Sequence, residues 1–145
     1  MKCTSRVRIN QMAMKRLSDA AAVSLEQTAE ALHTEVVQAQ VVPRMDGTLQ
    51  GEAFFVDTAG SPAGKVSLVH SMPYARRLYF HPEYHFHKTP WEETVHRKDG
   101  SVTHQKHDGN PNAKGKWFDD WKEGGKKGGF APETFKKFYR RNSGL

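Results

Sequence analysis

The residues with the clearest chemical potential are histidines, which gather in the middle of the chain. Six of them fall between residues 81 and 107, namely His81, His85, His87, His96, His104 and His107. Imidazole nitrogens at such spacings can bind one transition metal ion. A metal site also needs rigid support for its ligands, and Pro82 interrupts any helix between His81 and His85. We therefore expect surface or hydrogen-bonded histidines and no metal or other cofactor, with a histidine-dependent metalloenzyme as an alternative.

A nuclease of the His-Asn-His type is a second chemistry to weigh. Its side-chain types stand close together in His104, His107, Asn110 and Asn112. That chemistry needs a general-base histidine facing a metal ion that a following helix holds. The next segment supplies Asp119 and Asp120 but no histidine. The order does not fit, and a polar loop is the better interpretation.

Nucleophilic and phosphate-binding motifs are missing from the sequence. Cys3 lies near the start of the chain, and no Gly-x-Ser-x-Gly pattern occurs. Residues Gly124–Gly129 contain lysines but lack the Gly-Lys-Ser/Thr ending of a phosphate loop. We interpret this segment as a flexible joint. The prediction is a protein without catalytic residues, which is not an enzyme.

Composition bounds the class of protein. The chain has 145 residues, of which 37% are hydrophobic, enough for one domain with a single core. It has no apolar run of about 18 residues for a membrane span, and residues 1–10 lack the apolar part of a secretory signal. The single cysteine excludes an internal disulfide, so we expect folding in a reducing compartment.

The formal charge of +6 favours polyanionic partners. The densest groups of Lys and Arg, Lys114–Lys127 and Lys136–Arg141, stand among aromatic residues. This arrangement favours a solvated or protein-facing surface. A basic nucleic-acid-binding module is the alternative function that the charge leaves open.

A long amphipathic helix is the clearest expected element. Apolar or small residues recur at steps of three and four at Leu17, Ala21, Leu25, Thr28, Leu32, Val36 and Ala39. Pro43 ends the pattern. The spacing predicts a helix of about 25 residues, long enough to cross a small domain.

Two short strands are expected next, at Glu52–Asp57 and Lys65–Ser71, with a turn-rich loop between them. An Asp46-Gly47 turn precedes them. We expect an α+β fold in which the long helix packs on this small antiparallel sheet. Residues 88–109 are polar and charged, with few apolar residues, around a Lys98–Ser101 turn signal, which predicts a protruding two-stranded arm.

The C-terminal quarter predicts two short helices, Lys116–Lys122 and Pro132–Arg141, on either side of the glycine-rich joint. The expected organisation is one core domain formed by residues 11–87 and 110–141. Residues 88–109 form the arm, and residues 1–10 and 142–145 are expected to be flexible termini.

Two segments carry a resemblance to a known family. Ser71–Tyr84 contains Pro-Tyr-Ala followed by His-Pro-Glu-Tyr, and Asn110–Phe118 contains Asn-Pro-Asn-Ala before Gly-Lys-Trp-Phe. Together with the long upstream helix and an amphipathic helix ending at Arg141, they resemble the minor capsid, or head–tail joining (tail-completion), proteins of tailed bacteriophages. The departure is the arm, which separates Phe86 from the Asn-Pro-Asn turn.

The resemblance implies a structural virion protein at the phage neck. It implies a homo-oligomeric ring between portal or adaptor proteins and tail-tube or tail-terminator proteins, near genomic DNA in the channel. Aromatic side chains suit such contacts because they bury area and keep polar handles. The candidate interface residues are Pro73, Tyr74, Tyr79, Tyr84, Trp91, Trp117, Phe118, Phe135 and Tyr139.

Overall fold

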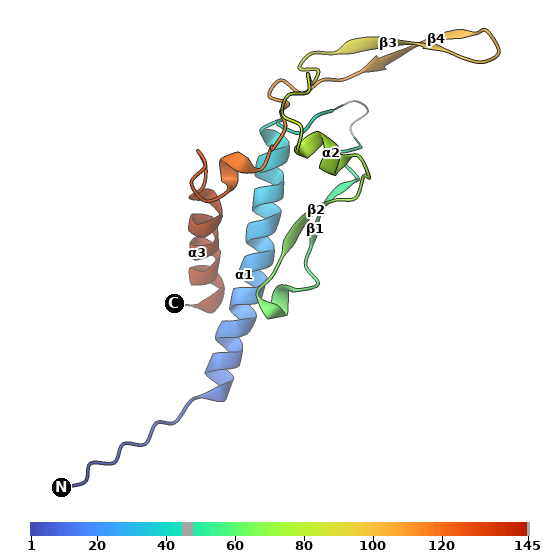
Figure 1. Cartoon of the computed structure of the whole chain (residues 1–145). Helices are drawn as coiled ribbons and strands as arrows, with labels where there is room; N and C mark the ends of the chain where they lie inside the picture. The colour runs from blue at the N-terminus through green and yellow to red at the C-terminus, as the bar shows by residue number, and fades with distance from the viewer. Residues whose placement is uncertain (45–47, 145) are drawn as a thin grey trace.

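The fold is α+β and is built along one long helix (Figure 1). A computed structural model describes residues 1–44 and 48–144; the predicted Asp46-Gly47 turn lies outside this range. In chain order the elements are α1 (Gln11–Gln38), β1 (Phe54–Asp57), η1 (Ser61–Ala63), β2 (Ser67–His70), α2 (Ala75–Tyr79), β3 (Trp91–His96), β4 (Val102–His107), η2 (Asp119–Trp121) and α3 (Phe130–Ser143).

Helix α1 confirms the long N-terminal helix and begins earlier than the apolar pattern. The Asn10 side chain accepts a hydrogen bond of 3.1 Å from the Ala13 N–H, which caps the free end of the helix. At the other end Gln40 adopts a left-handed φ of 54°, so the chain leaves the helix before Pro43. Residues 1–10 contain no helix or strand and are exposed.

The main partner of α1 is α3, which runs antiparallel along it (Figure 1). The expected packing of this helix on the small sheet also occurs, but α3 covers more of α1 than the sheet does. The buried residues Ala20, Ser24 and Thr28 are small and lie four apart, so the two backbones approach closely. Asn142 secures the contact by donating to Ser24 Oγ at 3.0 Å and to Gln27 Oε1 at 2.8 Å.

Helix α3 confirms the predicted terminal helix, with Pro132 in its first turn. It continues two residues beyond the predicted end at Arg141. Asn142 and Ser143 are therefore helical, although the sequence placed them in a flexible terminus.

Strands β1 and β2 form an antiparallel pair on the other side of α1 (Figure 1). They confirm the first hairpin with shorter bounds than predicted. Phe54 pairs with His70, and Asp57 pairs with Ser67. The connecting loop contains the 3₁₀ turn η1, which ends at Gly64 with a left-handed φ of 79°. The short helix α2 follows β2 and was not predicted.

Strands β3 and β4 confirm the arm as a separate antiparallel hairpin, in which Trp91 pairs with His107 and His96 with Val102. Its turn closes with the Arg97 N–H bonded to the Ser101 carbonyl at 2.9 Å. Figure 1 shows the hairpin projecting from the end of the molecule where α1 ends. Among the described residues, β3 and β4 pair only with each other.

The predicted helix Lys116–Lys122 is wrong. Lys116 adopts a left-handed φ of 48°, which an α-helix cannot accommodate, and only the 3₁₀ turn η2 forms. The following glycines also have a defined path. The Lys127 N–H bonds the Asp120 carbonyl at 2.6 Å, and a Cβ on Gly125 would lie 2.2 Å from the Asp119 carbonyl oxygen.

The hydrophobic core lies around the C-terminal end of α1. Its buried residues come from α1, the segment between α1 and β1, β1, α2 and the η2 region: Val36, Val41, Val42, Leu49, Phe54, Ala75, Trp117 and Trp121. Residues nearer the start of α1 pack on α3 and on the loop that contains η1. The core therefore supports the region from which α2 and the arm emerge.

Candidate interaction surface

The candidate surface begins at α2, where aromatic side chains leave the sheet. Pro73 is exposed in the turn before the helix, and Tyr74 at its N-terminus is 41% exposed. Phe80, directly after the helix, is 57% exposed and lies under the Arg76 guanidinium, 5.9 Å from the ring centroid. Exposed aromatic rings beside arginines are typical of protein interfaces.

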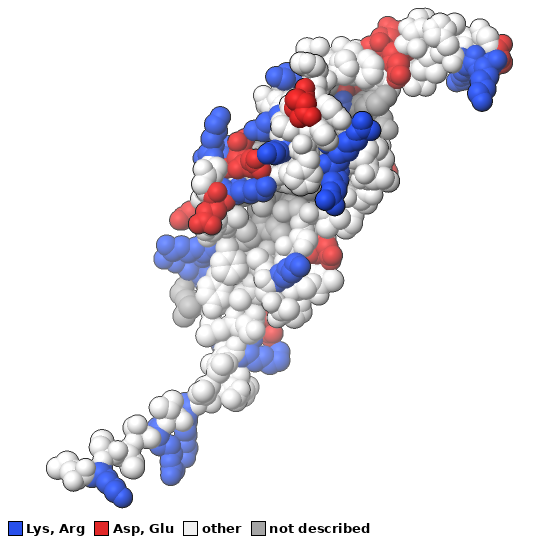
Figure 2. Space-filling model, in the orientation of Figure 1, with Lys and Arg blue, Asp and Glu red and all other residues white. Residues whose placement is uncertain are grey.

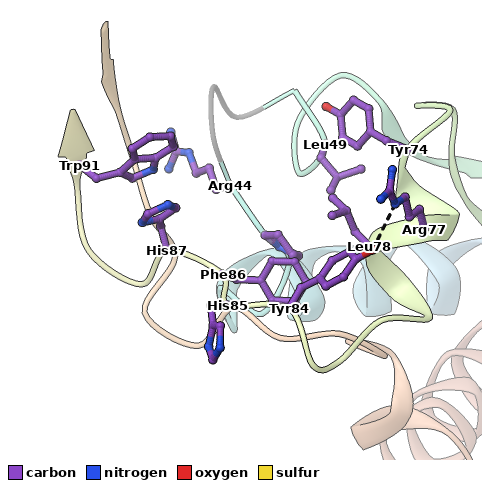
Figure 3. Close-up of a pocket in the computed structure, with 11 residues that line it drawn as sticks. Arg44, Leu49, Tyr74, Arg77, Leu78, Tyr84, His85, Phe86, His87 and Trp91 are labelled. Atoms are coloured by element: carbon purple, nitrogen blue, oxygen red, sulfur yellow. Dashed lines mark hydrogen bonds between the residues drawn. The ribbon is translucent and has the colours of Figure 1, made fainter. Parts of the chain in front are cut away.

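A cavity of about 440 Å³ opens beside α2 (Figure 3). Most of its lining is apolar, with Leu49 and Leu78 on one side and Trp91 on the other. Arg77 donates from Nε to the Tyr84 hydroxyl at 3.2 Å, which holds both side chains at the rim. The cavity thus joins the predicted residues Tyr74, Tyr84 and Trp91 into one surface, although they come from separate segments.

Tyr79 connects this surface to the η2 region. Its hydroxyl donates to Asp119 Oδ1 at 3.1 Å, and Lys122 Nζ lies 2.9 Å from the same oxygen. The Lys122 hydrogen bond is the main cause that lowers the pKa of Asp119, while burial raises the pKa of Tyr79. Tyr79 also packs edge-on against Trp117 with ring centroids 4.9 Å apart. One side of Tyr79 therefore packs in the body, and the other remains partly exposed.

Trp117 and Phe118 face the core. Trp117 is 1% exposed, so in this conformation it offers no area to a partner. Phe118 is half-buried, with its ring centroid 5.9 Å from that of Phe54. The last two predicted residues, Phe135 and Tyr139, stack on each other at 5.8 Å on α3, which lies across α1 from α2 (Figure 1).

The base of the arm is an aromatic stack. The Trp91 ring contacts the rings of His87 and His107, with centroid distances of 4.0 Å and 4.6 Å. His107 Nε2 lies 3.1 Å from Glu93 Oε2, and Arg44 forms an ion pair with Asp108 at 3.3 Å. These contacts fix the direction of the arm where it leaves the body.

The Asn-Pro-Asn segment ties the arm to the end of α1. Buried Asn110 donates from Nδ2 to the Val42 carbonyl at 2.7 Å. Asn112 donates to the Ala39 carbonyl at 2.9 Å, and the Lys114 N–H donates to Val41 at 3.0 Å. These bonds satisfy backbone carbonyls of the segment that follows α1. The two asparagines considered for a nuclease site are thus engaged with the backbone.

The histidines do not converge on one point. Across residues 1–44 and 48–144 there is no group of three side chains of His, Cys, Asp or Glu arranged to hold a metal ion. His81 instead pairs with Glu83 at 2.6 Å and lowers the pKa of that carboxyl through the hydrogen bond. His104 lies 3.5 Å from Glu92 on the arm.

The histidine whose pKa is most shifted is His70, which lies in the second predicted strand, Lys65–Ser71. Trp117 Nε1 donates to His70 Nε2 at 3.1 Å, and His70 Nδ1 lies 3.1 Å from the Leu49 carbonyl. The ring is therefore neutral, with its proton on Nδ1. Burial lowers its pKa to about 4. Phe54 stacks on it at 4.3 Å, which makes His70 part of the core.

No protein-family model, curated protein sequence or solved structure significantly matches this chain. In the described part of the chain, none of the helices has the length and apolar character that a bilayer crossing requires.

Proposed function

We propose that this protein is a structural subunit of a tailed-bacteriophage virion, part of the neck that joins the head to the tail. It assembles as a homo-oligomeric ring between portal or adaptor proteins and tail-tube or tail-terminator proteins, and it catalyses no reaction. The resemblance at Ser71–Tyr84 and Asn110–Phe118 names the family, and features of the fold support an assembly role.

The protruding arm is the observation that carries the proposal. Its six paired residues per strand extend from the body, and both outer edges present unpaired backbone groups within the described chain. A two-stranded hairpin alone is marginal in water. In the described part of the chain, the contacts that hold the arm to the body lie at its base, around Trp91 and His107, so the arm gains stability from a neighbouring subunit.

The surface beside α2 supplies a second contact area. Tyr74 lines the apolar cavity beside the arm base, and Phe80 at the other end of α2 is exposed beside a second hollow. The arm and this surface differ in shape, so contact between them on adjacent copies is heterologous, the type that closes rings. The same surface serves a portal or tail partner where it faces out of the ring.

Imaging of the assembled neck tests the proposal. Electron cryomicroscopy of purified virions is expected to place the chain in a ring at the head–tail junction. Negative-stain images of the purified protein, alone and mixed with the adjacent connector and tail proteins, are expected to show the same ring. Monomers in every mixture, together with a neck that lacks this chain, would refute it.

An arm deletion separates assembly from folding. Trp91 and His107 lie opposite each other, so an Asn-Gly turn can replace residues 92–106 and keep the base of the hairpin. The variant is expected to melt within about 2 °C of the native protein, because the arm adds no core contact. It is expected to be monomeric. A ring formed by this variant would remove the arm from the assembly mechanism, and Lys98→Ala at the exposed turn serves as control.

A further inference from the structure

The N-terminal segment is the most one-sided part of the chain in charge. Residues 1–18 contain five Lys or Arg and no Asp or Glu. Residues 19–129 contain 13 Lys or Arg against 15 Asp or Glu. Figure 2 shows these cations along an extension that leaves the body. The segment also exposes apolar side chains, since Val7 is 84% and Ile9 is 61% exposed.

The sequence of this segment has the alternation of a strand. In an extended chain Arg6 and Arg8 point to one side and Val7 and Ile9 to the other. The segment thus has a cationic face and an apolar face. Purely electrostatic binding to phosphates would leave the apolar face exposed to water. A groove with an apolar floor and carboxylates at its edge matches both faces of the segment.

The body carries such a groove on α1. A cavity of about 500 Å³ lies between α1, α3 and the loop after β1, lined by Glu26, Glu30, Ala31, Thr34, Thr58 and Phe138. We call it the α1 groove. Glu26 accepts a hydrogen bond from Ser61, and Glu30 is exposed. Within residues 1–44 and 48–144 neither carboxylate forms an ion pair.

We propose that residues 5–9 of one copy dock in the α1 groove of the next copy. This inference rests on the proposed ring assembly and names one of its contacts. From Glu26 to Thr34 the groove follows α1 for about 12 Å, and Ser5 to Ile9 span about 13 Å when extended. Arg6 then meets Glu30 and Arg8 meets Glu26, so the segment runs antiparallel to α1 and Cys3 lies toward Thr34, while Val7 and Ile9 cover Ala31 and Phe138.

The direction of the chain favours exchange between copies. Asn10 caps α1 in an extended conformation, with φ −79° and ψ 99°, and Figure 1 shows the segment leading away from the body. The groove begins about 24 Å further along α1 from Asn10. Segment and groove lie on different parts of the subunit, so each copy gives one contact and receives one, as a ring requires.

The lone cysteine allows a direct test, because Cys3 is exposed and stands two residues before Ser5. The native protein is mixed with a mass-tagged Cys3→Ser/Thr34→Cys variant under mild oxidation. Docking brings the two thiols to a millimolar local concentration, so the mixed disulfide is expected to form at least about tenfold faster than with a control. The control is Cys3→Ser/Ser101→Cys, with its thiol at the exposed tip of the arm.

Charge exchange identifies the contact. Arg6→Glu/Arg8→Glu in the segment, or Glu30→Lys in the groove, is expected to abolish the acceleration. Mixing the segment variant with the groove variant is expected to restore it at least in part, because the opposite charges meet again. All three positions are exposed, so the fold tolerates each change.

The outcomes separate this inference from the proposed function. Equal rates for Thr34→Cys and the arm-tip control would overturn the docking. A disulfide inside single chains that keep Cys3 and carry Thr34→Cys, without one in the mixture, would overturn exchange between copies. Duplex DNA binding that Arg6→Glu/Arg8→Glu abolishes, without accelerated cross-linking, would assign the segment to nucleic acid instead. Rings that persist with the reversed charges would leave the neck function standing without this contact.

Discussion

Acid is expected to destabilise this protein through one histidine. His70 is neutral in the fold because Trp117 donates to its Nε2 atom, and its own Nδ1–H is directed at the Leu49 carbonyl. Protonation places a hydrogen on Nε2, opposite the Trp117 N–H. The folded protein therefore resists protonation at this site, whereas the unfolded chain does not.

The direction and size of this loss of stability follow from the pKa values of His70 in the folded and unfolded protein. The pKa of His70 falls from 6.5 to about 4, mainly by burial. Its contribution to stability is complete above the unfolded value and is lost as the pH falls from about 6.5 to about 4, because only the unfolded chain takes up the proton there. At about 1.36 kcal/mol per pKa unit the upper limit is about 3 kcal/mol. The ring is only half-buried, and solvent screening reduces the expected loss to about 1–2 kcal/mol.

Urea denaturation of the native protein and of His70→Gln, at about pH 7 and about pH 4.5, measures the effect. The glutamine amide keeps an acceptor for Trp117 and does not titrate. Carboxylates such as Asp119 also lose stability contributions in acid, but they do so equally in both proteins. The native protein is expected to lose about 1–2 kcal/mol more than the variant on acidification.

His96→Gln, on the exposed face of the arm, is the matched control for removing an imidazole. It is expected to lose stability in acid as the native protein does. Nitrogen-detected NMR is expected to find the His70 proton on Nδ1 at neutral pH. Equal acid losses in the native protein and His70→Gln, or a proton on Nε2, would refute the reasoning.

Three further predictions concern packing. Asn110→Ala leaves the buried Val42 carbonyl, in the segment after α1, without its donor and is expected to cost about 2–3 kcal/mol in urea denaturation. Gly115→Ala brings a Cβ within 2.6 Å of backbone and is expected to cost about 1–3 kcal/mol, whereas Gly129→Ala has open space and is expected to be neutral by the same measurement. Ser24→Leu forces α3 from α1 and breaks the bond from Asn142, so thermal melting is expected to fall by about 5–10 °C; an unchanged midpoint would contradict that packing.

Local signals predicted the elements whose causes are local. The spacing of apolar residues and Pro43 gave α1 its type and approximate end. Turn-forming residues between β-compatible segments predicted both hairpins, because the pairing of strands that follow each other closely depends on neighbouring sequence. The bounds shifted where capping decided them, as at Asn10, which starts α1 before the apolar pattern begins.

The partner of α1 was out of reach for a physical reason. The buried residues in this part of α1 include Ala20, Ser24 and Thr28, which are small and bury little apolar area, and only Thr28 belonged to the predicted stripe. Small side chains let two helix backbones approach closely, and a search for periodic hydrophobicity does not single them out. The helix expected at Lys116–Lys122 failed similarly, because the left-handed backbone at Lys116 is imposed by tertiary contacts such as its N–H bond to the Tyr79 carbonyl.

The sequence predicted several residues of the candidate surface but not how they are arranged. Tyr74, Tyr84 and Trp91 do share one cavity, but their grouping depends on how α2 and the arm base fold together. Trp117 has the same composition signal and lies in the core. Aromatic content alone cannot separate these two roles, since rings serve cores and interfaces equally well.

The core is held by many contacts, whereas the N-terminal segment and the arm extend from it. This difference determines whether a variant alters stability or assembly. The core and the asparagine ties lie at one end of α1, and every strong contact of the arm lies at its base. The N-terminal segment and the arm leave opposite ends of the molecule (Figure 1). Changes in these extensions are therefore expected to alter assembly with little effect on melting, whereas changes at Asn110 or Trp117 alter melting first. A subunit with separate extensions at its two ends can reach a neighbour on each side, which is the geometry that repeated heterologous contacts need.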